Sequence, residues 1–166
     1  MMIILVRHGD ATHHTQRLTG GWTDSQLTEK GRAQIKAAAV KLAKDFAGRN
    51  CKLRILASDL QRASGSAQII DEELGFKGEI EHCRFLREYN NGIAAGMTEE
   101  EAKKHFCKPA SEQELDHRNY PGGETRNEFY RRNVHGLWHR ADVDKENLLI
   151  VAHKGTIQNI IFRWLG

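Results

Sequence analysis

The chain has 166 residues, of which 39% are hydrophobic and 28% are charged, and its formal net charge is +3. That length suits one domain with a sizeable core and is too short for two comfortable ones. The small, scattered positive excess argues against a nucleic-acid-binding stripe, and no apolar run approaches the ~20 residues of a membrane span. We therefore expect one domain over residues 1–166 that binds neither nucleic acid nor membrane.

The cysteines and the N-terminus point to the cytoplasm. Cys51, Cys83 and Cys107 form no motif, and an odd number fits free thiols in a reducing compartment. The apolar start passes straight into Arg7-His8-Gly9, without the basic front and the cleavage site of a signal peptide. The nine histidines make a zinc site an alternative, but no pair has the spacing of a known site, so we expect no metal.

The first half of the chain alternates strand and helix patterns. The predicted elements are a strand over 2–6, a helix over 28–46, a strand over 53–57, a helix over 59–74 and a weaker strand over 79–82. Thr28 is the expected cap of the first helix, and Gly75 closes the second. The first helix carries its small apolar residues along one side, namely Ala33, Ala37, Val40 and 43–47.

The second half begins with a less regular stretch over 84–123, which holds a helix start at 98–102 and both prolines. A helix over 124–141, a buried strand over 148–152 and a helix over 156–165 complete the chain. The candidate core residues of the first of these helices are Phe129, Val134, Leu137 and Trp138.

Three uniformly apolar strands alternating with helices predict a three-layer α/β/α sandwich with a mostly parallel central sheet. We interpret the stretch 84–123 as an insertion over the functional edge of that sheet. Open α/β sheets bind their ligands beyond the carboxyl ends of the strands, so the residues that follow each strand are the ones to compare.

Polar groups follow each strong strand: Arg7-His8-Gly9, then Ser58-Asp59 with Arg62, then His153-Lys154-Gly155. If the strands are neighbours, two arginines and two histidines meet at one rim, with Lys154 as a further candidate, beside two helix N-termini. Such a pocket suits a tetrahedral dianion such as phosphate, because a guanidinium grips phosphate oxygens bidentately. Within it a neutral histidine can act as a nucleophile, and the surrounding cations keep its ring neutral.

Five blocks in a fixed order support this interpretation. They are Leu5-Val6-Arg7-His8-Gly9 with 20–24 and 27–32, Ala57-Ser58-Asp59-Leu60-Gln61-Arg62-Ala63, Leu86-Arg87-Glu88 with Gly92 and Gly96, Pro121-Gly122-Gly123-Glu124, and Val151-Ala152-His153-Lys154-Gly155-Thr156-Ile157. Together they resemble the histidine phosphatase superfamily, the phosphoglycerate-mutase-like family, over nearly the whole chain. The resemblance implies a phosphoglycerate-mutase-like fold and chemistry without a metal or cofactor.

The resemblance also implies roles for individual residues. His8 would be the phosphorylated nucleophile, and Arg7, Arg62 and His153 would bind the phosphoryl group and stabilise its transition state. Glu88 matches the proton donor, which also activates the water that hydrolyses the phosphohistidine. Three further polar residues have plainer interpretations: Asp24 shapes the long loop, Ser58 orients Asp59 or a neighbouring main-chain group, and Glu124 stands at a helix start.

The sequence departs from the family pattern at several positions. Asp10-Ala11 replaces the usual Glu-Thr, and His14 stands in place of an asparagine, where it could still donate to phosphate. Lys154 replaces the first of two glycines, and either a phosphate-binding or a solvent-facing side chain fits there. Relatives usually continue beyond Gly166, so one sheet edge is expected to be bare or covered by a partner, and a homodimer stays open.

Because a mutase holds a second phosphate and protects its phosphohistidine with longer insertions, the short chain favours a phosphatase. The expected partner is a small phosphorylated molecule of open identity. A basic group in the insertion, formed by Lys103, Lys104, His105, Lys108 and Arg118, could bind a second anion or form a solvated face. A mutase, a non-catalytic phosphate-binding relative and a metal-dependent hydrolase are the alternatives.

Overall fold

The computed structural model describes residues 2–47, 53–76, 78–111 and 114–166, so Cys51 lies outside the described residues. Four strands form one parallel sheet in the order β1-β4-β2-β3. Their bounds are β1 Met2–Arg7, β2 Arg54–Ser58, β3 Ile80–Cys83 and β4 Asn147–Ala152. The parallel sheet agrees with the prediction, and its order places β4 between β1 and β2.

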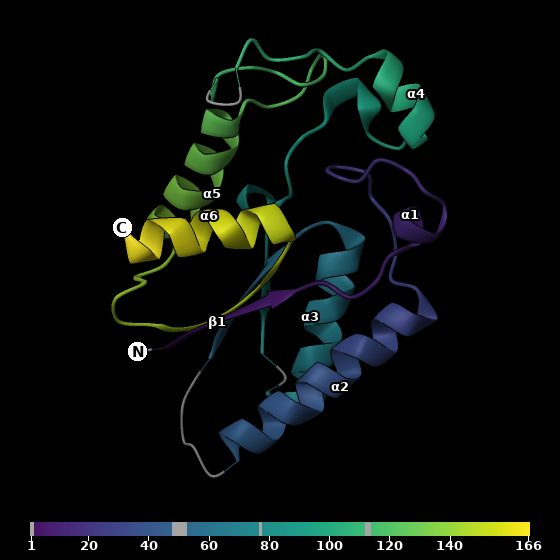
Figure 1. The fold of residues 1–166 in the computed structure, drawn as a ribbon. Helices are drawn as coiled ribbons and strands as arrows, with labels where there is room; N and C mark the ends of the chain where they lie inside the picture. Colours follow the sequence, from purple (N-terminus) through teal and green to yellow (C-terminus); the bar gives the residue numbers. More distant parts are fainter. Residues whose placement is uncertain (1, 48–52, 77, 112–113) are drawn as a thin grey trace.

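Helices cover both faces of the sheet. Their bounds are α1 Thr12–Thr15, α2 Glu29–Phe46, α3 Gln61–Leu74, α4 Glu99–Lys104, α5 Arg126–Arg140 and α6 Lys154–Leu165, with short 3₁₀ turns at Arg84–Leu86 and Gly92–Ala94. In Figure 1, α5 and α6 lie on one side of the sheet, and α2 and α3 lie on the other. The predicted three-layer α/β/α sandwich is therefore confirmed.

The side chains of β4 alternate between the two faces of the sheet and contribute to a core layer on each face. Leu148 and Ile150 pack among the residues beneath α5 and α6, whereas Leu149 and Val151 pack against α2 and α3. Successive side chains of a strand point to opposite faces, and nearly all those of β4 are buried, so both faces of this strand are covered. That burial is why the strand reads as an uninterrupted apolar run.

The structure corrects the packing face of α2. The helix buries Gly31, Ile35 and Ala39, whereas Ala33 and Ala37 are exposed. Residues four apart share one helix face, and the row that contains the large Ile35 side chain removes more apolar surface from water than the alanine row does.

Three helix starts also differ from the prediction. α3 begins at Gln61 rather than at 59, and α5 begins at Arg126, where Thr125 and Glu128 form a capping box. α6 begins at Lys154 rather than at 156, with His153 as its N-cap residue. Because β4 ends at Ala152, a single residue separates the central strand from this helix, and that residue is a histidine of the predicted site.

The 84–123 segment contacts the loop that follows β1. Thr19 and Met97 share a backbone hydrogen bond of 2.8 Å, and Gly96 donates to the Thr19 carbonyl at 3.1 Å. Figure 1 shows α4 beside the turn that carries α1. Among the described residues, no helix is both long enough and apolar enough to cross a bilayer.

Candidate active site

The carboxyl ends of three neighbouring strands meet at one edge of the sheet. In register, Arg7 pairs with Ala152, and Ala57 pairs with Val151. The backbone N–H of His8 continues the ladder by donating to the Ala152 carbonyl at 3.0 Å. The residues that follow β1, β2 and β4 are thereby brought to one place, as the sequence pattern predicts.

His8 is held in one tautomer. Its Nδ1 lies 2.7 Å from the carbonyl oxygen of Gly9, which can only accept, so Nδ1 carries the proton and donates it. The other ring nitrogen, Nε2, then keeps its lone pair and faces Nε of Arg62 at 3.3 Å. A Cβ at position 9 would collide with the Gly31 backbone, so glycine is needed for the loop to pass this close to the start of α2.

The His8 ring is neutral over a wide pH range. The pKa of His8 is lowered to about 3, chiefly by burial and also by the cations of Arg62 and Arg7, which together outweigh the opposing bond to Gly9. The side chain is only 8% exposed. A neutral imidazole with an unprotonated Nε2, whose lone pair here accepts only the 3.3 Å bond from Arg62, is the form that can attack phosphorus once a substrate draws Arg62 away.

Arg62 is a buried cation with fixed partners. It is 1% exposed, and its guanidinium donates to the carbonyl oxygens of Thr23 at 2.6 Å and Gly21 at 2.7 Å. Burial lowers the pKa of Arg62 to about 10, so the group stays charged at neutral pH. Its five N–H bonds exceed the three hydrogen bonds that it makes to described residues, so two can meet an anion.

His153 stands across from His8. The two ring centroids are 5.0 Å apart, and the His153 ring is 1% exposed. Its Nε2 lies 2.9 Å from the hydroxyl of Ser58, while its Nδ1 has no hydrogen-bond partner among the described residues. Ser58 accepts from the Leu60 N–H at 3.4 Å and can give its own proton to Nε2. The expectation that Ser58 orients a neighbouring main-chain group agrees with the Leu60 contact, and its bond to His153 is an addition.

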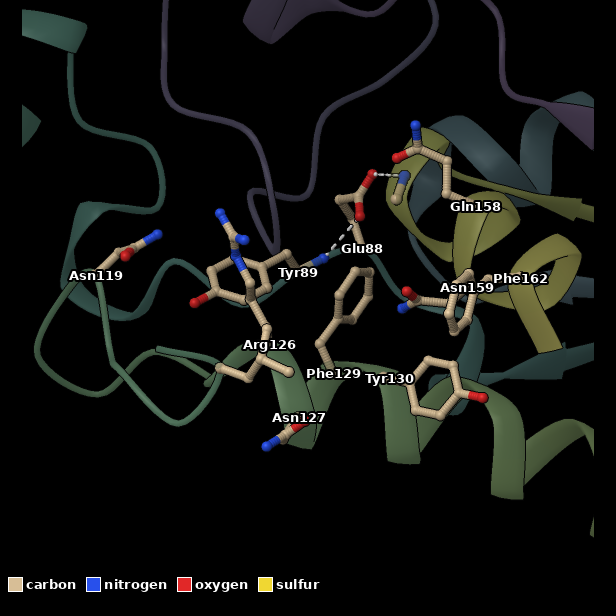
Figure 2. A pocket seen from close by; sticks show the side chains of 12 residues that line it. Glu88, Tyr89, Asn119, Arg126, Asn127, Phe129, Tyr130, Gln158, Asn159 and Phe162 are labelled. Atoms are coloured by element: carbon tan, nitrogen blue, oxygen red, sulfur yellow. Dashed lines mark hydrogen bonds between the residues drawn. The ribbon is translucent and has the colours of Figure 1, made fainter. Parts of the chain in front are cut away.

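Glu88 reaches the same edge from the 84–123 segment. Its carboxylate accepts from the N–H of Gly155 and from its own neighbour Tyr89, each at 2.9 Å (Figure 2). Gly155 lies in the first turn of α6, two residues after His153. A Cβ at position 155 would collide with the Glu88 carboxylate, so this glycine permits the contact.

Arg132 on α5 supports the segment that carries Glu88. Its guanidinium donates to the carbonyls of Phe85 at 2.9 Å, Arg87 at 3.1 Å and Glu88 at 3.0 Å. The carboxylate of Glu124 forms an ion pair with Arg132 at 2.6 Å. It also accepts a hydrogen bond from the backbone N–H of residue 90 at 3.0 Å. This corrects the interpretation of Glu124, whose carboxylate binds an arginine and a loop instead of the start of α5.

Contacts of Trp22 and Arg87 also hold the segment that carries Glu88. Trp22 donates its indole N–H to the Glu88 carbonyl at 2.8 Å, and the Arg87 guanidinium lies 4.9 Å from the indole ring. Arg87 also forms a bidentate pair with Asp59, with both contacts at 2.7 Å. The sequence analysis placed Trp22 and Arg87 in motifs without a role and missed Arg132, since no motif of the sequence contains it.

The remaining predicted residues lie at the rim. Arg7 is exposed at the end of β1, and its charge acts on His8. The exposed His14 lies 3.0 Å from Asp10, and its ring stacks at 6.2 Å from the His8 ring. Lys154 is exposed at the first position of α6. Asp24 caps α3 by accepting from the Gln61 N–H at 2.8 Å, which fits its predicted role in shaping the loop.

Three buried histidines make stability depend on pH. Burial lowers the pKa of His8 to about 3, that of His13 to about 4, and that of His153 well below its usual value. The unfolded chain therefore binds more protons than the folded one below about pH 6.5. The stabilisation is complete above that pH and is lost as the pH falls.

We expect the free energy of unfolding to decrease between pH 7 and pH 5, by up to about 1.4 kcal/mol per pH unit for each histidine. Urea titrations at pH 7, 6 and 5 measure this slope. His13→Gln should reduce this slope, because glutamine does not titrate in this range. Its amide can still bond to Ser25, which lies 2.6 Å from the His13 ring, so the local structure should be kept. His82→Gln, at an exposed position, should leave it unchanged. A stability that does not change over this range would contradict burial in the neutral form.

Comparison with known proteins identifies the family of the chain. The profile of the histidine phosphatase superfamily (branch 1) matches residues 3–166. The chain belongs to the histidine phosphatase superfamily. The resemblance found in the sequence is thus confirmed, and the strand-end site lies where the superfamily's sequence blocks converge.

Among the relatives of this histidine phosphatase superfamily member, some are named as mutases or mutase-like proteins and others as phosphatases. Phosphoglycerate mutase-like protein 4 of Arabidopsis thaliana is 32% identical over 166 residues, which is 97% of this chain and 70% of that protein. A 2,3-bisphosphoglycerate-dependent phosphoglycerate mutase of Brucella ovis is 31% identical, covering 96% of this chain and 79% of its own. The structure of a mycobacterial glucosyl-3-phosphoglycerate phosphatase superposes with a TM-score of 0.73 at 28% identity, over 98% of this chain and 78% of that one.

Proposed function

We propose that this chain is a metal-independent phosphomonoester hydrolase that carries the phosphoryl group transiently on His8. The observation that carries the proposal is the hydrogen bond from His8 Nδ1 to the Gly9 carbonyl, which leaves Nε2 unprotonated beside Arg62. The substrate partner is a small phosphorylated molecule. The name of the mycobacterial phosphatase supports the same activity.

The first step transfers the phosphoryl group to the enzyme. Nε2 of His8 attacks phosphorus, and the bond from phosphorus to the ester oxygen breaks. The protonated carboxyl of Glu88 gives its proton to the leaving oxygen, so the product alcohol departs neutral. Arg7, Arg62 and the unpartnered Nδ1 of His153 stabilise the charge on the equatorial oxygens, and His14 and Lys154 lie at the rim, where they can contact the same group.

The second step regenerates the enzyme. The Glu88 carboxylate takes a proton from water while the water oxygen attacks phosphorus, and the nitrogen–phosphorus bond breaks. Inorganic phosphate leaves, His8 recovers its lone pair, and Glu88 is protonated again for the next substrate. Each residue thus serves both halves of the reaction, and no metal or cofactor is required.

A mutase is the second candidate, because relatives that are 31–32% identical carry that name or a mutase-like one. A mutase must hold a second phosphate with additional cations. In the basic group of the insertion, Arg118 is already paired with Glu128 at 2.5 Å, whereas Lys103 and Lys104 are exposed. This pairing favours hydrolysis. A mutase would interconvert 2- and 3-phosphoglycerate when primed with 2,3-bisphosphoglycerate, and a phosphatase would release phosphate.

Trapping the covalent intermediate tests the proposal. The protein is mixed with a radiolabelled or mass-tagged aryl phosphate in excess chelator and quenched in alkali, where phosphohistidine survives. We expect turnover in chelator and a phosphate adduct that maps to the peptide containing His8. Turnover that requires added metal, or a label on another residue, would overturn the mechanism. No turnover and no label over a wide panel of phosphomonoesters would favour the non-catalytic phosphate-binding alternative.

A further inference from the structure

A cavity of about 650 Å³ opens beside Glu88, between α5, α6 and the loop before α5 (Figure 2). None of the phosphate-binding residues proposed above lines it. Its walls are aromatic, with rings from Tyr89, Phe129, Tyr130 and Phe162. That volume lies in the range of small-molecule sites, which are mostly apolar with a few polar groups that fix orientation.

The cavity and the candidate active site share a boundary. Glu88 and Gly155, which are joined by their 2.9 Å hydrogen bond, line the cavity, and Gly155 lies two residues after His153. A Cβ at position 155 would also come within 3.0 Å of the Phe129 ring. Glycine therefore keeps the space between the Glu88 carboxylate and the nearest aromatic wall open.

The in-line geometry of phosphoryl transfer directs the leaving group toward this cavity. In phosphoryl transfer the attacking and leaving atoms stand roughly in line on opposite sides of phosphorus. The leaving oxygen must also lie within hydrogen-bond reach of Glu88 if that residue protonates it. An alcohol that extends away from His8 and past Glu88 enters the space between Tyr89, Phe129 and α6.

We infer that this cavity binds the leaving group, and that the substrates are phosphomonoesters of bulky, ring-bearing alcohols with neutral hydrogen-bonding groups. This inference rests on the proposed phosphatase activity. The rings offer faces for stacking, and Asn119, Asn127, Gln158 and Asn159 supply amide donors and acceptors around them. Arg126 is the one cation among the described residues that line the cavity.

The volume and the charge of the cavity favour a ring-bearing leaving group over a three-carbon acid such as glycerate. The cavity equals the liquid volume of about 20 waters at ~30 Å³ each, which suits a leaving group of nucleoside size. A phosphoglycerate would leave most of the aromatic wall uncovered, and would bring a carboxylate to a cavity with a single cation. Neutral amides beside rings fit an uncharged heterocycle better.

The first test compares primary alkyl phosphates whose leaving oxygens are chemically alike. Glycerol 3-phosphate has a small leaving group, whereas benzyl phosphate and adenosine 5′-monophosphate carry rings. We expect kcat/KM to be at least about 10-fold higher for one or both ring-bearing esters. Equal or lower values for both, with glycerol 3-phosphate hydrolysed in a His8-dependent reaction, would overturn the inference and leave the proposed function standing.

Phe162→Ala removes one wall, and Leu165→Ala is its matched control. Both side chains project from α6 and are 69% and 80% exposed, so neither change should unfold the protein, but only Phe162 lines the cavity. We expect Phe162→Ala to lower kcat/KM for the preferred ring-bearing ester about 10-fold and to change glycerol 3-phosphate less than 2-fold. Leu165→Ala should change neither, and equal losses in both variants would contradict a specific wall.

A binding measurement that needs no turnover separates failure of the inference from failure of the mechanism. The product alcohols, adenosine and benzyl alcohol, are titrated into wild-type protein and into Phe162→Ala while the intrinsic fluorescence is followed. Saturable binding of either, weakened about 10-fold by Phe162→Ala, supports the cavity even if no phosphohistidine forms. Absence of binding of both alcohols would overturn the inference, whatever the outcome of the trapping experiment.

Discussion

Replacing His8 with alanine is expected to lower kcat/KM for any substrate by at least about 10⁴-fold and to abolish the trapped phosphoenzyme. The variant removes the Nε2 lone pair that accepts from Arg62 at the edge of the sheet. Water could then attack phosphorus directly, but without a nucleophile positioned in line with the leaving oxygen. Single-turnover assays with an aryl phosphate in chelator measure the loss.

The control for this variant is His82→Ala, at an exposed position on β3, which should retain activity within about 2-fold. Inorganic phosphate should still raise the Tm of His8→Ala, because Arg7, Arg62 and His153 remain. Such protection would show that the variant is folded and binds phosphate. Substantial turnover by His8→Ala would contradict the covalent mechanism proposed for His8.

Glu88→Gln is expected to have the second largest effect, and its size should depend on the leaving group. For an alkyl phosphate the leaving oxygen must be protonated, so kcat/KM should fall by about 10²- to 10⁴-fold. For an aryl phosphate with an acidic phenol, phosphorylation needs no proton donor, and the fall in kcat/KM should be less than about 10-fold. Parallel assays with the two esters measure this difference.

The same variant should accumulate the phosphoenzyme when it is supplied with an aryl phosphate. In the proposed mechanism Glu88 also activates the water of the second step, so its loss should slow dephosphorylation while phosphorylation of His8 continues. A burst of one phenol per active site, followed by slow turnover, is the expected time course. Glu99→Gln, at an exposed position in the first turn of α4, should behave as wild type. Equal losses with both esters would show that Glu88 acts only by positioning other groups.

The convergence of the candidate site residues could be predicted from sequence because these residues closely follow buried strands. The apolar runs ending at Val6, Ala57 and Ala152 predict neighbouring parallel strands, whose carboxyl ends must meet. The position of the next few side chains is then set by backbone geometry alone. His8, Arg62 and His153 required no knowledge of tertiary packing beyond this rule.

The support beneath Glu88 could not be predicted in the same way. Arg132 lies in a helix where arginine is ordinarily solvated, and its bonds to three carbonyls depend on how α5 packs against the 84–88 turn. The cavity beside Glu88 depends equally on the angle between α5 and α6. Both features arise between elements, whereas local patterns report only on single elements.

The strand order has a consequence for how the molecule folds. β4 lies between β1 and β2, and within the described residues β1 pairs only with β4, which is nearly the whole chain away. During synthesis the apolar β1 segment therefore emerges long before β4 and stays without this native neighbour until β4 is made. Such long-range parallel pairing is intrinsically slow and leaves an unpaired edge exposed to aggregation. The candidate site, which is built from the ends of β1, β2 and β4, cannot form until β4 has been made.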